Sequence, residues 1–450
     1  MVVGEGAAAV WDRWRVAVER LLPEAPRSDL PRGRLAFGFV VAFLGAVGFQ
    51  LLMPAGWSRL QRVWAEDGAR FLLDGITQPF ATNLVSPYGG YLHTIPRLAA
   101  ELVSVLPLEW AATGFAVLAA VPRALVALVV FAASAGHLRS LPVRFAHAAL
   151  VVVLPVGNSE PLDNVTNLHW FLLYGVFWAL LWRREPRVPV AVVVFVVLAT
   201  LSSPLVVLLI PVALLRLALR RDLALPVAFL GAAAVQAVVM VFAERNPYSH
   251  DPVDPVQVVL AALLRVPVAA FTGSEQVERY YPALGNAPVL VTLVLVCLPV
   301  LAGLRWGGRP GRLLVALGLG YSVLVIVVTL TTNWGQQLQV QQPGVVLAAQ
   351  RYSIAPCLFL FAAVAVGLDA VPRETWARLA LKTGQVVFAL VVFWSVVQHV
   401  HARGGVLEGL PWGDSVARAR EQCAAGGSVG RFEHEPDRWF FHVPCAYLAR

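Results

Sequence analysis

The chain has 450 residues, of which 58% are hydrophobic and only 14% are charged, whereas soluble proteins carry about 25% charged residues. Apolar runs long enough to cross a membrane recur between residues 35 and 400. The net charge of +8 comes from short basic clusters between these runs, a pattern that follows the positive-inside rule and excludes a nucleic-acid-binding surface. The composition therefore predicts an all-α, polytopic helical membrane bundle.

The first 34 residues are mixed polar and basic, and they lack the pattern of a cleavable signal peptide. Within them, residues 7–22 place apolar side chains at helical spacing, with arginines between. This pattern predicts an amphipathic helix that either lies on the cytoplasmic membrane surface or packs against the bundle. We therefore divide the chain into a cytoplasmic segment (1–34), a transmembrane domain (35–400) and a tail outside the cytoplasm (401–450).

About eleven spans are expected, and the third to sixth of them are short. Their approximate ranges are 35–53, 110–135, 145–156, 168–182, 188–201, 204–219, 223–242, 288–304, 313–330, 352–370 and 383–400. Every second connection is short and rich in arginine, which assigns these connections and the N-terminus to the cytoplasm. The other connections are longer and hold most of the Trp, Tyr, His, Asn, Gln and acidic residues. We expect any chemistry on that outer face.

The first outer connection contains an acidic pair, Glu66 and Asp67, in the stretch "VWAEDGARFL" (Val63–Leu72). The residues from 67 to 76 can form a short helix lying on the membrane. A carboxylate at this place suits a general base, and Asp67 is our candidate, with Glu66 as the second choice. The alternative is that Asp67 is only the N-cap of the helix that begins at Gly68.

The same connection continues with a polar stretch that turns tightly at Gly89–Gly90 and leads into a second interfacial helix at about 95–105. Three of its side chains are candidates to bind the acceptor or the donor phosphate: Tyr91, His93 and Arg97. The alternative for the last two is a structural pairing with Glu101, one helical turn further on.

The second outer connection, "NSEPLDNVTNLHWFLLYG" (Asn158–Gly175), places hydrogen-bonding groups beside an aromatic side chain. Asp163, Asn167 and His169 are therefore candidates to face a sugar, although His169 can equally satisfy a buried hydrogen bond. Glu160 with Asp163 raises the question of a divalent cation. We see no tight ligand cluster and assign no metal site, and no zinc-type spacing of cysteine or histidine is present.

Two later stretches also attract attention. Asp254 can start a further interfacial helix that reaches about Phe271. The stretch "AQRYSIAP" (Ala349–Pro356) opens a late span with Arg351. The planar fork of an arginine matches phosphate oxygens, and the alternative is an interfacial anchor that snorkels to the headgroups.

An acidic pair just after the first span, two interfacial helices in the same connection and an Arg-Tyr pair at the start of a late span together resemble the GT-C glycosyltransferases. These membrane enzymes take a sugar from a polyprenyl-phosphate donor on the outer membrane face. The resemblance covers the region from 35 to 400 loosely, and its specific motifs cover less than a tenth of it. It implies a lipid-linked sugar donor, and it implies that Arg351 contacts the lipid phosphate.

The chemistry of such a transfer agrees with these residues. A single carboxylate suffices as base for inverting transfer, an arginine suits the leaving phosphate, and a helical bundle can hold the lipid tail. We therefore expect an inverting glycosyltransferase of a bacterial plasma membrane. Its acceptor would be a glycan, a lipid or a protein of the cell envelope, and its partners would be membrane lipids and the polyprenyl-phosphate sugar.

Two other functions stay open. A glycan ligase or polymerase shares the topology but needs no early acidic pair. A transporter or a lipid or oligosaccharide flippase should carry charges at the span centres and internal repeats. We expect neither feature here, because the span centres look uncharged and no repeat is visible.

The tail is predicted to be a small outer appendage with a helix at 413–423 and a strand near 438–442. Cys423 and Cys445 lie in it, and a disulfide between them is possible if the tail is outside the cytoplasm. Cys297 and Cys357 lie in apolar runs and are expected to be small core residues.

Overall fold

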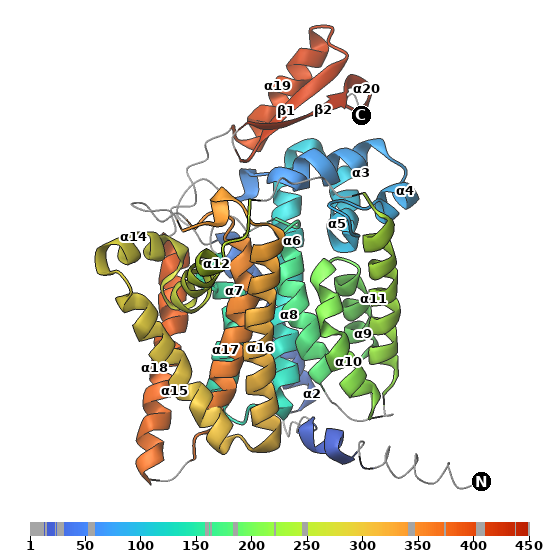
Figure 1. Cartoon of the computed structure of the whole chain (residues 1–450). Coiled ribbons are helices and arrows are strands. Elements are labelled where there is room, and N and C mark those ends of the chain that lie inside the picture. Colours follow the sequence, from blue (N-terminus) through green and yellow to red (C-terminus); the bar gives the residue numbers. More distant parts are fainter. Residues whose placement is uncertain are drawn as a thin grey trace, which may run out of the picture.

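The computed structural model describes residues 16–22, 31–52, 59–157, 164–182, 188–219, 222–244, 251–340, 347–372, 375–401, 410–436 and 438–448, together with residues 13, 24 and 162. Helices make up nearly all of the regular structure in these residues, and the sheet found among them has two strands. Figure 1 shows a helical bundle with short helices across one end, and the small C-terminal unit stands above them.

The bundle is built mainly from long apolar helices. These are α2 (Arg32–Leu52), α6 (Ala111–Ala133), α11 (Ala224–Phe242), α15 (Ala287–Trp306), α16 (Gly308–Thr332), α17 (Arg351–Ala370) and α18 (Thr375–His401). Among the described residues, eight helical stretches are long and apolar enough to cross a membrane, or nine if one bent pair counts as a span. The chain is therefore a multi-pass helical membrane protein in its architecture.

The bent pair corresponds to the fifth and sixth predicted spans. The helix α9 (Val190–Thr200) is followed by η6 (Pro204–Leu209) with α10 (Ile210–Leu217), and the chain bends by 119° between them. The bend falls at the Ser202–Pro204 turn, where proline at a helix start favours a new direction. The two expected spans thus form a broken span or a re-entrant hairpin.

The third and fourth predicted spans are the short helices α7 (Leu141–Val153) and α8 (Leu168–Leu181). Helices of this length measure about 20 Å, and the hydrocarbon core is about 30 Å thick. Both have one end beside the arginine-rich connections. Their other ends, together with residues 154–157 and 164–167 next to them, are therefore recessed below the opposite surface of the bundle.

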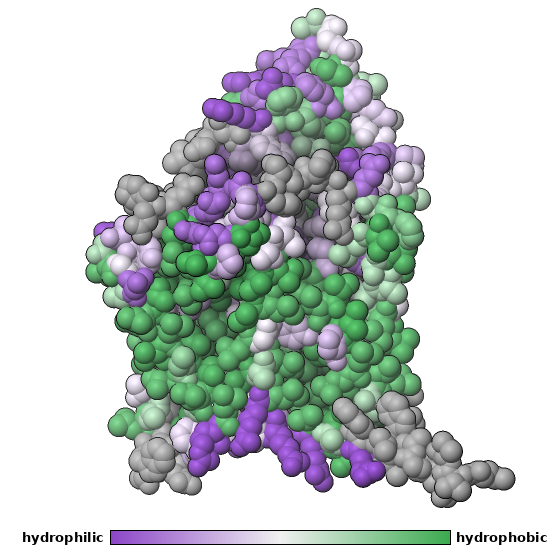
Figure 2. Space-filling view, in the orientation of Figure 1, coloured by the Kyte–Doolittle hydropathy of each residue, from purple (hydrophilic) through white to green (hydrophobic). Residues whose placement is uncertain are grey.

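Arginines of the short connections gather at one end of the bundle, which we call the basic end. They include Arg34, Arg139, Arg305, Arg309 and Arg312. Figure 2 shows the hydrophilic band there, an apolar belt above it and polar residues again at the opposite end, which we call the loop end. The sequence predicted this separation. Of the predicted amphipathic helix, the described part buries Val18 and Leu22 in the core, which favours packing against the bundle.

Short helices cover the loop end. They are η1 (Arg59–Gln61), the π-helix η2 (Asp67–Leu72), α3 (Leu73–Thr77), α4 (Phe80–Val85), α5 (Thr94–Ser104) and η3 (Leu108–Trp110). The predicted turn between α4 and α5 is present: Tyr88 and Tyr91 exchange backbone hydrogen bonds, with Gly89 at φ +60° and Gly90 at φ +87°. Positive φ at both central positions defines the tight hairpin turn that glycine allows.

A further helical stretch crosses the bundle. α12 (Pro255–Leu263) begins at Asp254, whose carboxylate accepts from the backbone N–H groups of Val256 and Gln257, as predicted for an N-cap. It continues as the π-helix η7 (Leu264–Val268), α13 (Ala269–Thr272) and α14 (Ser274–Leu284). Figure 1 shows α12 nearly end-on, across the direction of α16 and α17. Residues 255–272 are long and apolar enough to span a membrane, yet this orientation agrees with the expected interfacial helix.

The tail is more structured than predicted. It contains α19 (Trp412–Ala424), an antiparallel hairpin of β1 (Val429–His434) and β2 (Trp439–Pro444), and α20 (Cys445–Leu448). The helix and the second strand were predicted, and β1 was not. The disulfide Cys423–Cys445 is formed. Aromatic rings fill the unit, with Trp412 stacked on Phe432 at 5.5 Å.

Candidate functional site

The carboxylate of Asp67 joins the first outer connection to the second. Its Oδ2 accepts from the backbone N–H of Val165 at 2.9 Å, and its Oδ1 accepts from the N–H of Thr166 at 3.0 Å and from the Thr166 hydroxyl. These donors lie just before α8. Asp67 therefore does not cap its own helix, where no side-chain cap bond is formed; it satisfies amide groups at the start of another one, where a negative charge is also favoured by the helix dipole.

Asp67 is completely buried, and two effects on its pKa oppose each other. Burial penalises the ionised carboxylate, while the three hydrogen bonds from Val165 and Thr166 favour it. Burial prevails, with a smaller contribution from the negative charge of Glu66, and the pKa of Asp67 rises to about 7. The carboxylate is thus enclosed, fully hydrogen-bonded and titratable near neutrality.

Glu66 differs from Asp67 in being half-exposed. The pKa of Tyr91 is raised mainly by burial. The negative charge of Glu66 raises this pKa further, and the positive charge of Arg351 lowers it. The charges of Glu66 and Arg351 therefore act on the Tyr91 phenol in opposite directions. Ring contacts through His169 and Trp170 also join Tyr91 to Tyr352, which lies beside Arg351.

The residue that binds Asp67 also orients His169. Nδ1 of His169 lies 2.8 Å from the backbone oxygen of Thr166. Because a carbonyl only accepts hydrogen bonds, the neutral imidazole carries its proton on Nδ1 and keeps the lone pair on Nε2. The buried-hydrogen-bond alternative for His169 is therefore present at Nδ1, and the other nitrogen retains acceptor capacity.

Tyr91 and His93 form one aromatic cluster above this chain of contacts. Their rings stack at 3.9 Å, and the Tyr91 ring lies 6.2 Å from that of His169. His93 is buried and contacts Phe71 and Tyr88. Its pKa is lowered well below the usual value, chiefly by burial, so it is a neutral ring at physiological pH.

Arg351 opens α17, one of the two innermost helices: all of α8 and the apolar window of α17 are buried. Its guanidinium lies 4.9 Å from the ring centre of Tyr352, and Tyr352 in turn meets Trp170 edge-to-face at 5.6 Å. The N-terminal ends of α8 and α17 therefore meet through Trp170 and Tyr352. Both ends favour negative charge.

The Arg97 side chain forms hydrogen bonds within the layer of short helices. It is fully buried, and Nη1 donates to Asp74 at 3.0 Å and to the side-chain oxygen of Asn83. The predicted partner Glu101 instead accepts from Asn83. These bonds join η2–α3, α4 and α5 into one rigid layer. The alternative that Arg97 pairs directly with Glu101 is wrong, because Arg97 pairs with Asp74 in the folded layer.

The remaining predicted residues are less informative. Asn167 is buried directly before α8, and its backbone N–H donates to the side chain of Asn164. Asp163 and Glu160 lie outside the described residues. In the part of the chain that is described, no group of three or more His, Cys, Asp or Glu side chains has the arrangement of a metal site.

The sequence did not predict that the tail touches the acidic pair. The Ala65 N–H donates to the Glu435 oxygen at 2.5 Å, and the Glu435 N–H donates to the Val63 oxygen at 3.1 Å. Ala65 has φ +30°, which non-glycine residues rarely adopt. A Cβ on Gly68 would lie 3.1 Å from Phe441 of β2. The tail thus contacts the chain on both sides of Glu66–Asp67, and it holds Ala65 in a strained conformation.

A second unpredicted feature is Arg265 in η7. It is buried, and its guanidinium donates to the backbone oxygens of Ala348 at 2.8 Å and Gln337 at 3.4 Å. Glu278 accepts from the Leu347 N–H at 2.7 Å. Together they fix the chain just before Arg351, and no local sequence pattern reveals such a long-range clamp.

The expectation that span centres lack charges is wrong. Arg123 lies in the middle of α6 and is buried, where it donates to the backbone oxygens of Val151 and Val152, both at 2.8 Å. Its guanidinium also lies 4.2 Å from the centre of the Phe171 ring. It satisfies carbonyls at the recessed end of α7, as helix ends inside a membrane require.

No family model matches the chain, and no curated protein is significantly similar to it. The arrangement of these side chains therefore carries the functional argument alone.

Proposed function

We propose that this protein is an inverting membrane glycosyltransferase that moves a sugar from a polyprenyl-phosphate donor to an acceptor outside the cytoplasm. The observation that carries the proposal is the convergence of three separate stretches at the recessed start of α8 and the neighbouring start of α17. Hydrogen bonds and ring contacts bring the acidic pair, two neutral histidines with aromatic neighbours, and Arg351 into this one region. A one-sided polar site above an apolar bundle fits a lipid-linked donor.

Within the acidic pair, the geometry supports a division of roles. A general base must touch the proton that it removes, and Asp67 is enclosed with both oxygens hydrogen-bonded. Glu66 is half-exposed beside it. We therefore assign the proton transfer to Glu66 and give Asp67 the role of fixing the two outer connections. The sequence suggested Asp67 as the base and Glu66 as the second choice, and we now propose the reverse.

The reaction is a single displacement. The acceptor hydroxyl oxygen forms a bond to the anomeric carbon as the bond from that carbon to the phosphate oxygen breaks, and its proton passes to the Glu66 carboxylate. The donor leaves as polyprenyl phosphate, whose charge Arg351 stabilises, supported by the N-terminal end of α17. Attack from the face opposite the leaving group inverts the anomeric centre.

Two observations support the assignment of the site to the outer side of the membrane. The loop end lies opposite the arginine-rich basic end (Figure 2), and basic connections are cytoplasmic in membrane proteins. The tail at the loop end contains the disulfide Cys423–Cys445, and disulfides persist in oxidising compartments outside the cytoplasm.

The test is transfer from a panel of radiolabelled polyprenyl-phosphate sugars to a membrane extract by the purified full-length protein. Glu66→Gln should lower the rate by about 10²–10⁴-fold, the usual contribution of a general base. Arg351→Gln should lower donor turnover without loss of folded protein. Asp254→Asn is the matched control, because asparagine is also a good N-cap and Asp254 lies outside the site.

Full activity of Glu66→Gln would reject Glu66 as the base. Absence of transfer by the wild type with every donor would reject the glycosyltransferase, and a lipid-flipping assay in vesicles would then test transport.

A further inference from the structure

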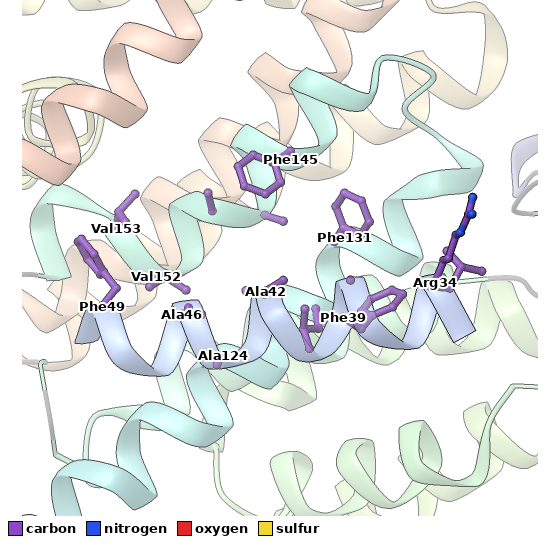
Figure 3. Close-up of a pocket in the computed structure, with 17 residues that line it drawn as sticks. Arg34, Phe39, Ala42, Ala46, Phe49, Ala124, Phe131, Phe145, Val152 and Val153 are labelled. Carbon is purple, nitrogen blue, oxygen red and sulfur yellow. The ribbon is translucent and has the colours of Figure 1, made fainter. Parts of the chain in front are cut away.

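A second feature lies away from the acidic pair, at the side of the bundle. A groove of about 510 Å³ runs between α2, α6 and α7 and opens laterally. Apart from Arg34, all of its lining side chains are apolar, and many are small. Figure 3 shows α2 along the groove, with Arg34 at one end and Phe49 at the other.

The small residues of α2 create this space. A Cβ added to Gly38 or to Gly45 would meet no atom within 4 Å, and alanines face them from α6 and α7. A methylene group is about as large as a water molecule, which occupies roughly 30 Å³ in the liquid. The groove therefore has room for one acyl chain of ordinary length.

Apolar walls alone do not select a ligand in a membrane, because every lipid tail is equally apolar. Selection needs the charged end of the groove. Arg34 lines it at the basic end. The guanidinium of Arg144 lies 4.3 Å from the centre of the Phe131 ring, which also lines the groove, and its Nε is buried without a hydrogen-bond partner among the described residues. Two arginine side chains thus lie where the headgroup of a lipid would be if its acyl chain occupied the groove.

We propose that this groove is a binding site for one anionic glycerophospholipid of the leaflet at the basic end, which the positive-inside rule makes the cytoplasmic leaflet. One acyl chain fills the space along Gly38 and Gly45, and the phosphate binds Arg34 and Arg144. The site is independent of the transferase reaction. It lies between α2, which leads to the acidic pair, and α7, which leads to the residues that bind Asp67.

The experiment uses the full-length protein in nanodiscs that contain equal amounts of phosphatidylglycerol and phosphatidylcholine with identical acyl chains. After transfer to mild detergent, native mass spectrometry counts the retained lipids. The wild type should keep one phosphatidylglycerol per chain. Gly38→Leu with Gly45→Leu should fill the groove without a clash and reduce retention at least tenfold. Gly231→Leu is the matched control, since Gly231 also has open space around it.

The charge is tested separately. Arg34→Gln, alone and combined with Arg144→Gln, should reduce the preference for phosphatidylglycerol over phosphatidylcholine at least fivefold. Arg305→Gln with Arg309→Gln, at the same end of the bundle but outside the groove, should leave it unchanged. The single Arg34 variant keeps the test valid if Arg144 proves necessary for folding.

Three results would overturn the proposal. The first is equal lipid retention by the wild type and the filled-groove variant. The second is an unchanged headgroup preference in both arginine variants. The third is displacement of phosphatidylglycerol by one equivalent of polyprenyl phosphate, which would assign the groove to the donor lipid instead.

Discussion

The neighbours of the Asp67 carboxylate are all hydrogen-bond donors, from the backbone and side chain of Thr166 and the backbone of Val165. These donors stabilise an ionised carboxylate. Burial opposes this effect, because it excludes the water that would also stabilise the charge. A buried carboxylate in this balance responds to pH in the neutral range. Two predictions follow at the level of single residues.

The first prediction concerns pH. The pKa of Asp67 rises from 3.8 to about 7 on folding, so between these values the folded state holds the proton more tightly than the unfolded state. The stability that this group contributes is therefore complete below its unfolded pKa and is lost as the pH rises through about 7. Thermal unfolding in detergent should show a falling Tm between about pH 5 and pH 8. Asp67→Asn, which cannot titrate, should flatten that slope, and parallel slopes would refute the raised pKa.

The second prediction concerns Thr166. Thr166→Val removes the hydroxyl donor and keeps the shape and the backbone donors. A hydrogen bond to a charged group contributes about 1.5–3 kcal/mol, so the free energy of unfolding should fall by about that amount at pH 8 and by less at pH 5, where Asp67 is protonated. Thr166→Ser is the control that restores the donor. An equal loss at both pH values would show that the hydroxyl does not interact with the charge.

The sequence identified the acidic pair, but not which member is enclosed. That distinction depends on where Val165 and Thr166 lie, about 100 residues further along the chain. Thr166 was visible only as part of the "NVT" stretch (Asn164–Thr166), in which nothing distinguishes a donor to Asp67 from a surface threonine. Arg97 was ambiguous for the same reason, because Asp74 and Asn83 approach it only after α4 and α5 fold back on η2.

At the scale of elements, the start of α17 is held by residues far from it. Arg265 binds the oxygens of Ala348 and Gln337, Glu278 binds the Leu347 N–H, and Ala349 has φ +54°. A turned, strained backbone persists where surrounding contacts determine it. Residues of η7 and α14 therefore determine the backbone path just before Arg351, and with it the orientation of the Arg351 side chain.

This arrangement gives the third prediction. Arg265→Gln leaves buried carbonyl oxygens without their donors, at a cost of about 1–3 kcal/mol for each. In the transfer assay the KM for the donor should rise more than kcat falls, because Arg351, the proposed phosphate ligand, is displaced while Glu66, the proposed base, is not. Arg265→Lys should recover part of the affinity. A fall in kcat with an unchanged KM would contradict this positioning role.

Periodicity predicted the long helices of the bundle, because each is a continuous apolar run. It did not settle the stretches at 188–219 and 255–272, where apolar residues are equally frequent but the chain bends or crosses the bundle. Composition cannot distinguish a span from a buried re-entrant pair, since both avoid polar residues for the same reason. The hairpin strand β1 was missed because "VGRFEH" (Val429–His434) is short and half polar.

At the scale of the whole molecule, the tail and the membrane domain act as one unit. The Trp412 indole N–H donates to the Leu108 oxygen at 2.6 Å, and Arg420 forms an ion pair with Glu109. Together with the backbone bonds between Glu435 and residues 63–65, these contacts attach the tail at two places on the first outer connection.

The fourth prediction tests this attachment. Cys445→Ser opens a loop of intermediate length, for which the loss of stability is about 3 kcal/mol. The tail should become protease-sensitive, and the rate of transfer should fall, because the backbone around Glu66 loses its partner strand. The disulfide-free helical bundle should keep its circular dichroism. Cys297→Ser, at an exposed thiol that is not in the disulfide, is the matched control. Unchanged activity with a digested tail would separate the tail from the site.

The pairing of Trp64 with Glu435 also sets an order of events during synthesis. Residues 63–65 leave the ribosome first, and their partner Glu435 follows roughly 370 residues later. Until Glu435 is present, Ala65 lacks the hydrogen-bond partner that holds its strained conformation, and the backbone next to Glu66 and Asp67 is not fixed. A nascent chain that ends before Glu435 would insert its helices and still lack the contact that holds Ala65, so the synthesis of Glu435 decides when the first outer connection reaches its final backbone conformation.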